Sequence, residues 1–130
     1  MTKVLKPLGT KALPLFASGK VRDTFQNPKR TGLLLMGASG RLSTHNIVHE
    51  SEVPHKGEVL TALTVFWAQH MLQDIPNHLI AWGKEIYEYL PEGEYPEDFH
   101  LRALVVKKLD IIPYEFILRA RLAGSLWKSY

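Results

Sequence analysis

No cysteine occurs among the 130 residues of this chain, which excludes disulfide bonds, thiolate catalysis and cysteine-based zinc sites. No apolar run approaches the roughly 18 residues that a membrane-spanning helix needs. Residues 1–7 lack the apolar stretch of a signal peptide. Lysine and arginine form no long cluster, and the formal net charge is +3. We therefore expect a cytoplasmic protein with small anionic ligands and with neither nucleic-acid nor membrane partners.

What is present is the composition of an ordinary globular protein, with 45% hydrophobic and 22% charged residues. A chain of this length can bury roughly two thirds of the surface that its unfolded form exposes. We therefore expect one domain, or one part of a larger domain.

Alternation of apolar and polar residues predicts a strand over residues 20–25, with Asp23 and Phe25 on one face and Lys20 and Arg22 on the other. Residues 26–32 have turn composition, and residues 33–38 read as a short buried strand, which together give a hairpin. Gly19 and Lys20 at its entry can place backbone N–H groups and an ammonium on phosphates. The alternative is an ordinary hairpin with a solvent-facing lysine. The spacing is not that of a P-loop.

The clearest helix is predicted from about Glu58 to Gln73, because apolar residues recur at helical spacing. The stripe consists of Val59, Leu60, Leu63, Phe66, Trp67, His70 and Met71. We interpret the pair Phe66 and Trp67 as core, and the helix as scaffold.

The remaining elements are short. Strands are expected at residues 78–82, 85–90 and 101–108, whereas residues 39–57 read mostly as binding loops rich in polar side chains. Residues 91–98 form an acidic loop, which we interpret as solvated rather than as a cation site. His45, His49 and His55 lack metal-ligand spacing and an obvious carboxylate partner, so we predict no metal site. One helix among many strands predicts the α+β class.

A further strand is predicted over residues 115–122, where alternation places Arg119 and Arg121 on one face. A turn at Gly124 and Ser125 then opens a helix. Paired guanidiniums before such a turn suit a phosphate or a carboxylate. The competing interpretation is a solvated arginine face on an edge strand.

Four segments in order make the chain resemble the SAICAR synthetase (phosphoribosylaminoimidazole-succinocarboxamide synthase) family. They are residues 18–23, residues 39–67, residues 106–113 and residues 115–130. The resemblance implies an ATP-grasp-like lobe with a curved antiparallel sheet and one main amphipathic helix. It also implies an ATP-dependent ligase that joins aspartate to carboxyaminoimidazole ribotide in purine biosynthesis. The match covers about the first half of a typical member, so residues 1–130 are expected to be its N-terminal ATP-binding lobe.

The resemblance assigns residues to each ligand, although it assigns no catalytic residue. Those expected at ATP are Gly19, Lys20, Val21, Arg22, Lys108 and Leu109. Those expected on the ribotide side are Arg119, Ser125, Arg41, Ser43 and Lys56. Magnesium is expected for the family, with its ligands in the C-terminal half, which this sequence does not contain.

Two departures from the family pattern keep other functions open. Gly40 and Asn46 stand where the family commonly has aspartates, and the magnesium-binding half is absent. The alternatives are half of a split enzyme, a non-catalytic remnant that binds nucleotide or ribotide, and an interaction module. A complementing chain or a homo-oligomer is accordingly an expected partner.

Overall fold

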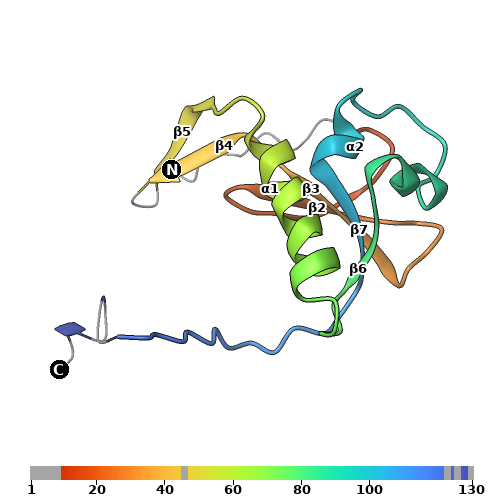
Figure 1. Ribbon diagram of the computed structural model, residues 1–130. Coiled ribbons are helices and arrows are strands. Elements are labelled where there is room, and N and C mark those ends of the chain that lie inside the picture. The colour runs from red at the N-terminus through yellow and green to blue at the C-terminus, as the bar shows by residue number, and fades with distance from the viewer. Residues whose placement is uncertain (1–9, 45–46, 122–123, 125–126, 129–130) are drawn as a thin grey trace.

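The computed structural model describes residues 10–44, 47–121, 124 and 127–128 (Figure 1). Its centre is a five-stranded sheet in the order β1-β2-β3-β7-β6, with every neighbouring pair antiparallel. These strands are β1 (Leu15–Ser18), β2 (Arg22–Gln26), β3 (Leu33–Ala38), β6 (Leu79–Trp82) and β7 (Ala103–Lys107). A separate hairpin consists of β4 (Arg41–Thr44) and β5 (Ile47–Glu52). The α+β class and the antiparallel sheet are confirmed.

The helical elements are short except for one. They are α1 (Lys56–Phe66), the π-helical turn η1 (Trp67–Met71), the 3-10 helix η2 (Gly83–Glu88) and α2 (Phe99–Arg102). None of the helices in the described ranges is long and apolar enough to cross a membrane.

The predicted hairpin forms from β2 and β3, with Arg22 opposite Ala38 and Gln26 opposite Leu34. Alternation along β2 is confirmed, because Asp23 and Phe25 are buried while Arg22 is exposed. Phe25 belongs to the main apolar cluster, and Asp23 is a carboxylate facing the interior. That buried carboxylate becomes important for the turn between β1 and β2.

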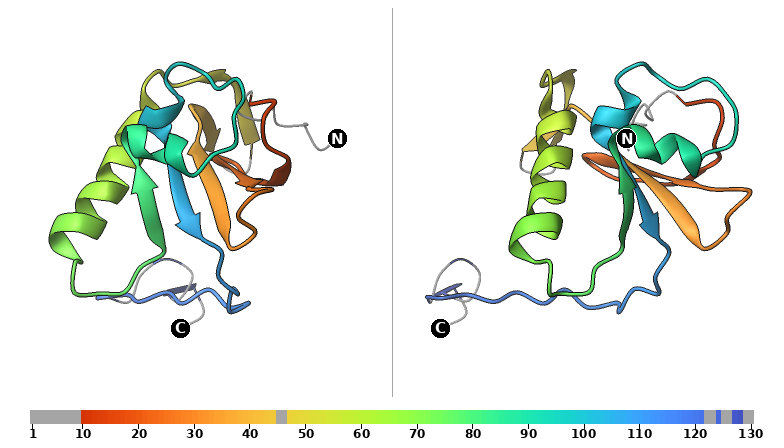
Figure 2. Two further views of the ribbon diagram at one scale, coloured as in Figure 1. Left: turned by 90° about the vertical axis from the view of Figure 1, so that its right-hand side faces the viewer. Right: turned by 45° about the vertical axis from the view of Figure 1, so that its right-hand side comes forward.

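Strand β7 is buried on both of its faces. Ala103 and Val105 join the main cluster, which lies between the sheet and the segment containing η2 and α2. Its other members are Leu13, Phe25, Leu35, Ala81, Ile86 and Phe99. Leu104 and Val106 are also buried, and Leu104 lines a cavity with residues of α1. Figure 2 shows the resulting layers, with α1 on one side of the sheet and η2 on the other.

Three short segments differ from their prediction. Residues 85–90 are not a strand, because the chain leaves the sheet at Gly83, whose φ of 58° is left-handed, and continues as η2. Leu101 and Arg102 end α2 rather than begin β7. Residues 41–52, expected mostly as loop, pair as the β4–β5 hairpin.

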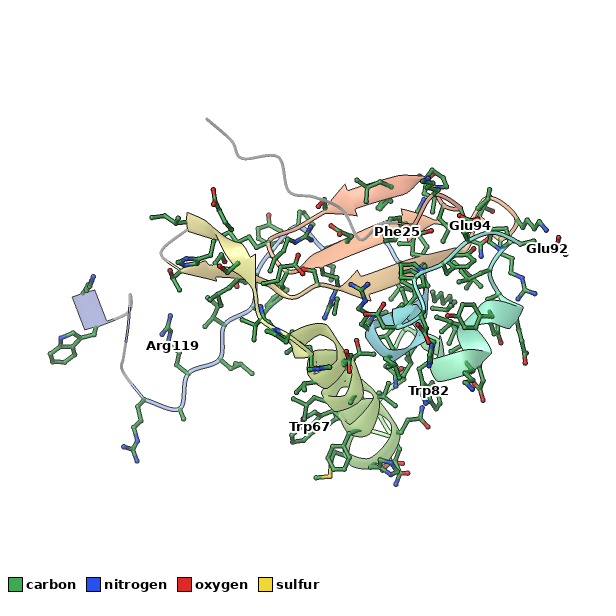
Figure 3. The ribbon with its side chains drawn as sticks, turned by 90° about the horizontal axis from the view of Figure 1, so that it is seen from above. Phe25, Trp67, Trp82, Glu92, Glu94 and Arg119 are labelled. Carbon is green, nitrogen blue, oxygen red and sulfur yellow. The ribbon has the colours of Figure 1, made fainter. Side chains whose placement is uncertain are left out.

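The helix over residues 58–73 is confirmed, although it begins at Lys56 and its last turn is π-helical. The interpretation of Phe66 and Trp67 as core is wrong. Phe66 and Trp67 are 48% and 49% exposed, and Trp67 projects from the helix in Figure 3. Helix α1 instead buries Gly57 and Thr61, so small residues at its N-terminal end make the closest contact with the sheet.

The strand predicted over residues 115–122 is not formed in its described part, residues 115–121. Residues 108–121 run away from the sheet without strand pairing in their described part (Figure 1). Phe116 is 79% exposed and Leu118 is 100% exposed. Alternation was present, but a strand also requires a neighbouring strand to pair with its N–H and C=O groups.

Candidate functional site

The tight turn between β1 and β2 presents a lysine to solvent. The Gly19 N–H donates to the Arg22 carbonyl at 2.8 Å, which closes the turn. A Cβ at Gly19 would stand 3.3 Å from that same oxygen, so a side chain fits poorly here. Lys20 and Arg22 are exposed beside it. Two cations on a closed turn suit a polyanion.

Ser39, which lies between β3 and β4, is hydrogen-bonded to this turn. Ser39 donates both its N–H and its hydroxyl to the Val21 carbonyl, at 2.9 and 3.0 Å. Ser39 is itself buried, at the junction between β3 and β4. The Val21 carbonyl is therefore fixed toward the body of the protein.

Arg41 reinforces the turn from the interior. Its guanidinium donates to the Gly19 carbonyl at 3.0 Å and to Asp23 Oδ1 at 2.7 Å. The Arg41 and Asp23 side chains are 5% and 0% exposed. The Ser18 hydroxyl donates to the same Asp23 oxygen at 2.5 Å. The Arg41 side chain thus lies inside, beneath the residues expected at ATP, rather than on an open ribotide surface.

Lys56 links the turn to α1. Its ammonium donates to the Arg41 carbonyl at 2.6 Å, and Lys56 is the first residue of the helix. Ser43 lies further along β4, half-buried and paired with Val48. The structure therefore joins Lys56 and Arg41 closely, while Ser43 stands on the hairpin beyond them.

Gly40 is tightly enclosed. A Cβ at this position would lie 2.8 Å from the Val53 carbonyl oxygen and 3.2 Å from Glu52 Oε2. The aspartate that the family commonly carries here does not fit this backbone, and the Glu52 carboxylate is close to the space it would use.

Lys108 comes close to β1 although the two are far apart in sequence. Its N–H donates to the Gly32 carbonyl at 2.8 Å, and its ammonium lies 5.4 Å from the centroid of the Phe16 ring. Phe16 precedes the turn by three residues. The fold thus connects both segments that were expected at ATP, through an exposed aromatic ring. Leu109, next to Lys108, is also exposed.

The arginines expected at the ribotide phosphate lie elsewhere. Arg119 stands on the extended segment that leaves the sheet (Figure 3). A Cβ added at Gly124, whose φ is 64°, would lie 2.7 Å from Arg119 Nη1, so the guanidinium lies against this glycine. Arg121 is exposed on the same segment, and Ser125 lies outside the described residues.

Metal ligands do not converge in the part of the chain that the structure describes. Its histidines and carboxylates form no group of three or more that could hold an ion. His49 bonds Thr44 at 2.7 Å. His55 contacts Glu58 at 2.9 Å, so the expectation that it lacks a carboxylate partner is wrong. His45 lies outside the described residues. Magnesium therefore has no fitting site among these side chains.

Three residues that form or support the candidate site were not predicted from the sequence, namely Phe16, Asp23 and Ser39. A signal existed for Asp23, because a carboxylate on the apolar face of an alternating strand requires a buried partner. That partner, Arg41, is 18 residues away in the sequence, and its identity depends on the fold.

Comparison with known proteins places these features in a family. A model of the SAICAR synthetase family matches residues 15–130. The phosphoribosylaminoimidazole-succinocarboxamide synthase of Saccharomyces cerevisiae is 42% identical over 124 residues, which cover 91% of this chain and 40% of the relative. The enzyme of the same name from Neisseria meningitidis serogroup C is 42% identical over 114 residues, covering 87% of this chain and 38% of the relative.

Solved structures agree. The SAICAR synthase of Saccharomyces cerevisiae, solved in complex with SAICAR, aligns with a TM-score of 0.80 at 38% identity, covering 92% of this chain and 42% of that one. A second structure of a SAICAR synthase aligns with a TM-score of 0.82 at 40% identity, covering 98% and 44%. This chain spans about 40% of the length of the curated relatives it matches.

Proposed function

We propose that this chain, which belongs to the SAICAR synthetase family, is the N-terminal ATP-binding lobe, residues 1–130, of a cytoplasmic ligase. The complete enzyme would join aspartate to carboxyaminoimidazole ribotide using ATP. The observation that carries the proposal is the β1–β2 turn, closed by its own backbone, with Lys20 exposed above and Arg41 beneath it.

In this proposal the turn binds the triphosphate. The Lys20 ammonium and the Arg22 guanidinium offset its negative charge, and Gly19 lets the phosphates approach the backbone. The purine base lies against Phe16, near Lys108 and Leu109. Support for this comes from the exposed ring of Phe16 and from the Lys108 ammonium 5.4 Å from its centroid. Aromatic faces stack readily on bases.

The chemistry demanded of such a site is mainly positioning and charge stabilisation. A carboxylate oxygen of the ribotide attacks the γ-phosphorus, the bond to the β-phosphate oxygen breaks, and ADP leaves. The amine of aspartate then attacks the acyl carbon, forms the amide and releases phosphate. Cations beside the triphosphate stabilise the charge that shifts toward ADP. No step is assigned to magnesium, because the described residues do not fit it.

The ribotide is proposed to bind at Arg119 and Ser125, with Lys56 from the start of α1 and Ser43 from β4 also contributing. Support comes from the Arg119 guanidinium, which lies against Gly124, next to Ser125. The β4–β5 hairpin and the segment bearing Arg119 project to the same side of the sheet in Figure 1.

Two measurements test the proposal. Isothermal calorimetry of the chain with ATP should show binding, and failure to bind ATP would contradict the ATP-binding role. Coupled ADP release with the ribotide, aspartate, ATP and magnesium then separates the enzyme from a remnant. ATP binding without turnover would favour the second function, a non-catalytic nucleotide- or ribotide-binding chain. The replacement of both family aspartates, at Gly40 and Asn46, favours that alternative.

A further inference from the structure

The interior face of the β1–β2 turn rests on a buried arginine. Arg41 donates to the Gly19 carbonyl at 3.0 Å and to Asp23 Oδ1 at 2.7 Å, and its side chain is almost fully buried. Burying a guanidinium costs free energy unless a carboxylate and further acceptors compensate. Asp23 supplies the carboxylate and Gly19 supplies a backbone acceptor, so the Nη2 end of the guanidinium is held beside the turn.

Fixing the Gly19 carbonyl also fixes the next amide. In a trans peptide the C=O of one residue and the N–H of the following residue point in opposite directions. All peptide bonds in the described structure are trans. Because the Gly19 oxygen points inward to Arg41, the Lys20 N–H points away from Arg41, toward the outer side of the turn. An anion on that side would meet this amide and the Lys20 ammonium together.

We propose that Arg41 is a positioning residue for the nucleotide, which orients the Gly19–Lys20 peptide from inside and does not contact the ribotide. The inference rests on the proposed ATP-binding function of the turn. It reassigns Arg41 from the ribotide side, where the resemblance placed it.

The geometry also identifies the informative substitution. Both bonds are donated by one nitrogen of the arginine side chain, Nη2. Lysine also ends in a single charged nitrogen, but that nitrogen is one bond closer to the backbone than Nη2, so it reaches Gly19 and Asp23 less well. Arg41→Lys therefore retains the interior cation while disturbing the turn, and Arg41→Gln removes the charge as well.

The experiment measures three quantities for the wild type, Arg41→Lys, Arg41→Gln and a control, Arg30→Lys. Arg30 is exposed and contacts Tyr89 and the Glu88 carbonyl, away from the turn. The quantities are the Kd for ATP, the Kd for carboxyaminoimidazole ribotide, and amide hydrogen exchange of peptides covering residues 18–23 and 103–107. We expect both Arg41 variants to weaken ATP binding about tenfold and to raise exchange at residues 18–23 about tenfold. Ribotide affinity and exchange at residues 103–107 should match the control.

Several results would overturn the proposal. Lost ribotide affinity with unchanged ATP affinity would make Arg41 a substrate contact. Faster exchange throughout the sheet in both variants would make it a core residue only. Unchanged exchange at residues 18–23 in Arg41→Lys would remove the positioning role, even if the wild type failed to bind ATP. If the wild type does not bind ATP, the proposed ATP-binding function is refuted. The exchange measurement still decides whether Arg41 orients the turn.

Discussion

Lys20 and Arg41 lie on opposite sides of one turn, and burial separates their roles. Lys20 is exposed and can meet a ligand, whereas the Arg41 guanidinium is occupied by Asp23 and by the Gly19 carbonyl. A cation in water is partly screened, while a cation in the interior must be compensated by its neighbours. Under the proposed function, Lys20 contacts the ligand and Arg41 orients the backbone, although both residues carry the same charge.

Replacing Lys20 with alanine should weaken ATP binding while leaving the fold intact. A charge-assisted contact contributes on the order of 1.5–3 kcal/mol, so the Kd should rise by about tenfold or more. Isothermal calorimetry measures the change, and thermal denaturation checks the fold. Lys84→Ala, at an exposed position of η2, is the matched control. An unchanged Kd in Lys20→Ala would count against the assignment of the turn.

Tyr95 gives a prediction on pH. Burial, and secondarily the nearby Tyr87, raise the pKa of Tyr95 above its ordinary value of 10.0. The folded state therefore holds this proton more tightly than the unfolded state. The resulting stability is fully present below pH 10 and is lost as pH rises through the folded-state pKa. Tyr95→Phe should reduce this alkaline loss, measured as the free energy of unfolding by urea between pH 8 and 11. An identical pH profile in the two proteins would contradict the prediction.

How much of the site could be predicted depends on the residue. The turn at Gly19 and Lys20 is a local motif, and both residues lie at the entry to β2, as the alternation predicted. The inward position of Asp23 was also visible from alternation along β2. The burial of Arg41 was not, because its neighbours come from a hairpin 18 residues earlier. Phe16 gave no signal, since its proximity to Lys108 requires that β1, β3 and β7 share a sheet.

At the scale of the secondary-structure elements, the first turn of α1 packs closely against the end of β3. Gly57 lies so close to the end of β3 that an added Cβ would stand 2.5 Å from the Ala38 carbonyl oxygen. Lys56, beside it, bonds the Arg41 carbonyl at 2.6 Å. The start of the helix, the end of β3 and the base of the turn are therefore packed as one unit.

Gly57→Ala should consequently destabilise the fold, because the methyl group meets backbone that cannot rotate away. Overpacking of this kind costs roughly 1–3 kcal/mol. Urea denaturation followed by tryptophan fluorescence gives the free energy of unfolding. Gly32→Ala is the control, since a Cβ there would meet nothing within 4 Å. Equal stability of the two variants would show that the contact is relaxed in solution.

Periodicity predicted which side chains share a face, but not what covers that face. It succeeded for β2, whose two neighbours are adjacent in sequence. It identified α1 as a helix but misjudged its stripe, because Phe66 and Trp67 face outward. For residues 115–122 the alternation was present, but it could not reveal that no strand of the described structure pairs with residues 115–121. Hydrophobic periodicity predicts helix or strand conformation, whereas burial of a face depends on which other elements pack against it.

At the scale of the whole molecule, one region with exposed apolar side chains surrounds the C-terminal part of α1. Helix α1, the loop after it and β6 line an open cavity of about 430 Å³. Most of its lining is apolar, and it includes Leu63, Trp67, Leu72 and Ile75, all of them exposed. The segment after β7 adds exposed side chains such as Ile111 and Phe116. Exposed apolar side chains of this kind favour association.

The chain alone should therefore self-associate at micromolar to millimolar concentration. Light scattering across a concentration series measures the mass, and Trp67→Lys should lower it by placing a charge on the apolar face. Lys11→Ala, at an exposed position outside this surface, is the control. A monomer that remains monodisperse at all concentrations would contradict the prediction.

The position of β7 has a consequence for synthesis on the ribosome. It is the last strand of the sheet in sequence, yet it lies between β3 and β6. Strands β1 to β3 can pair as they emerge, but β6 has no neighbour until residues 103–107 have left the exit tunnel. Insertion of one late strand then completes the sheet and covers Phe25 and Leu35 together with Ala103 and Val105. The sheet therefore stays open beside β3 until residues 103–107 have been synthesised, and the joining of β3 to β6 is the late step in the formation of this sheet.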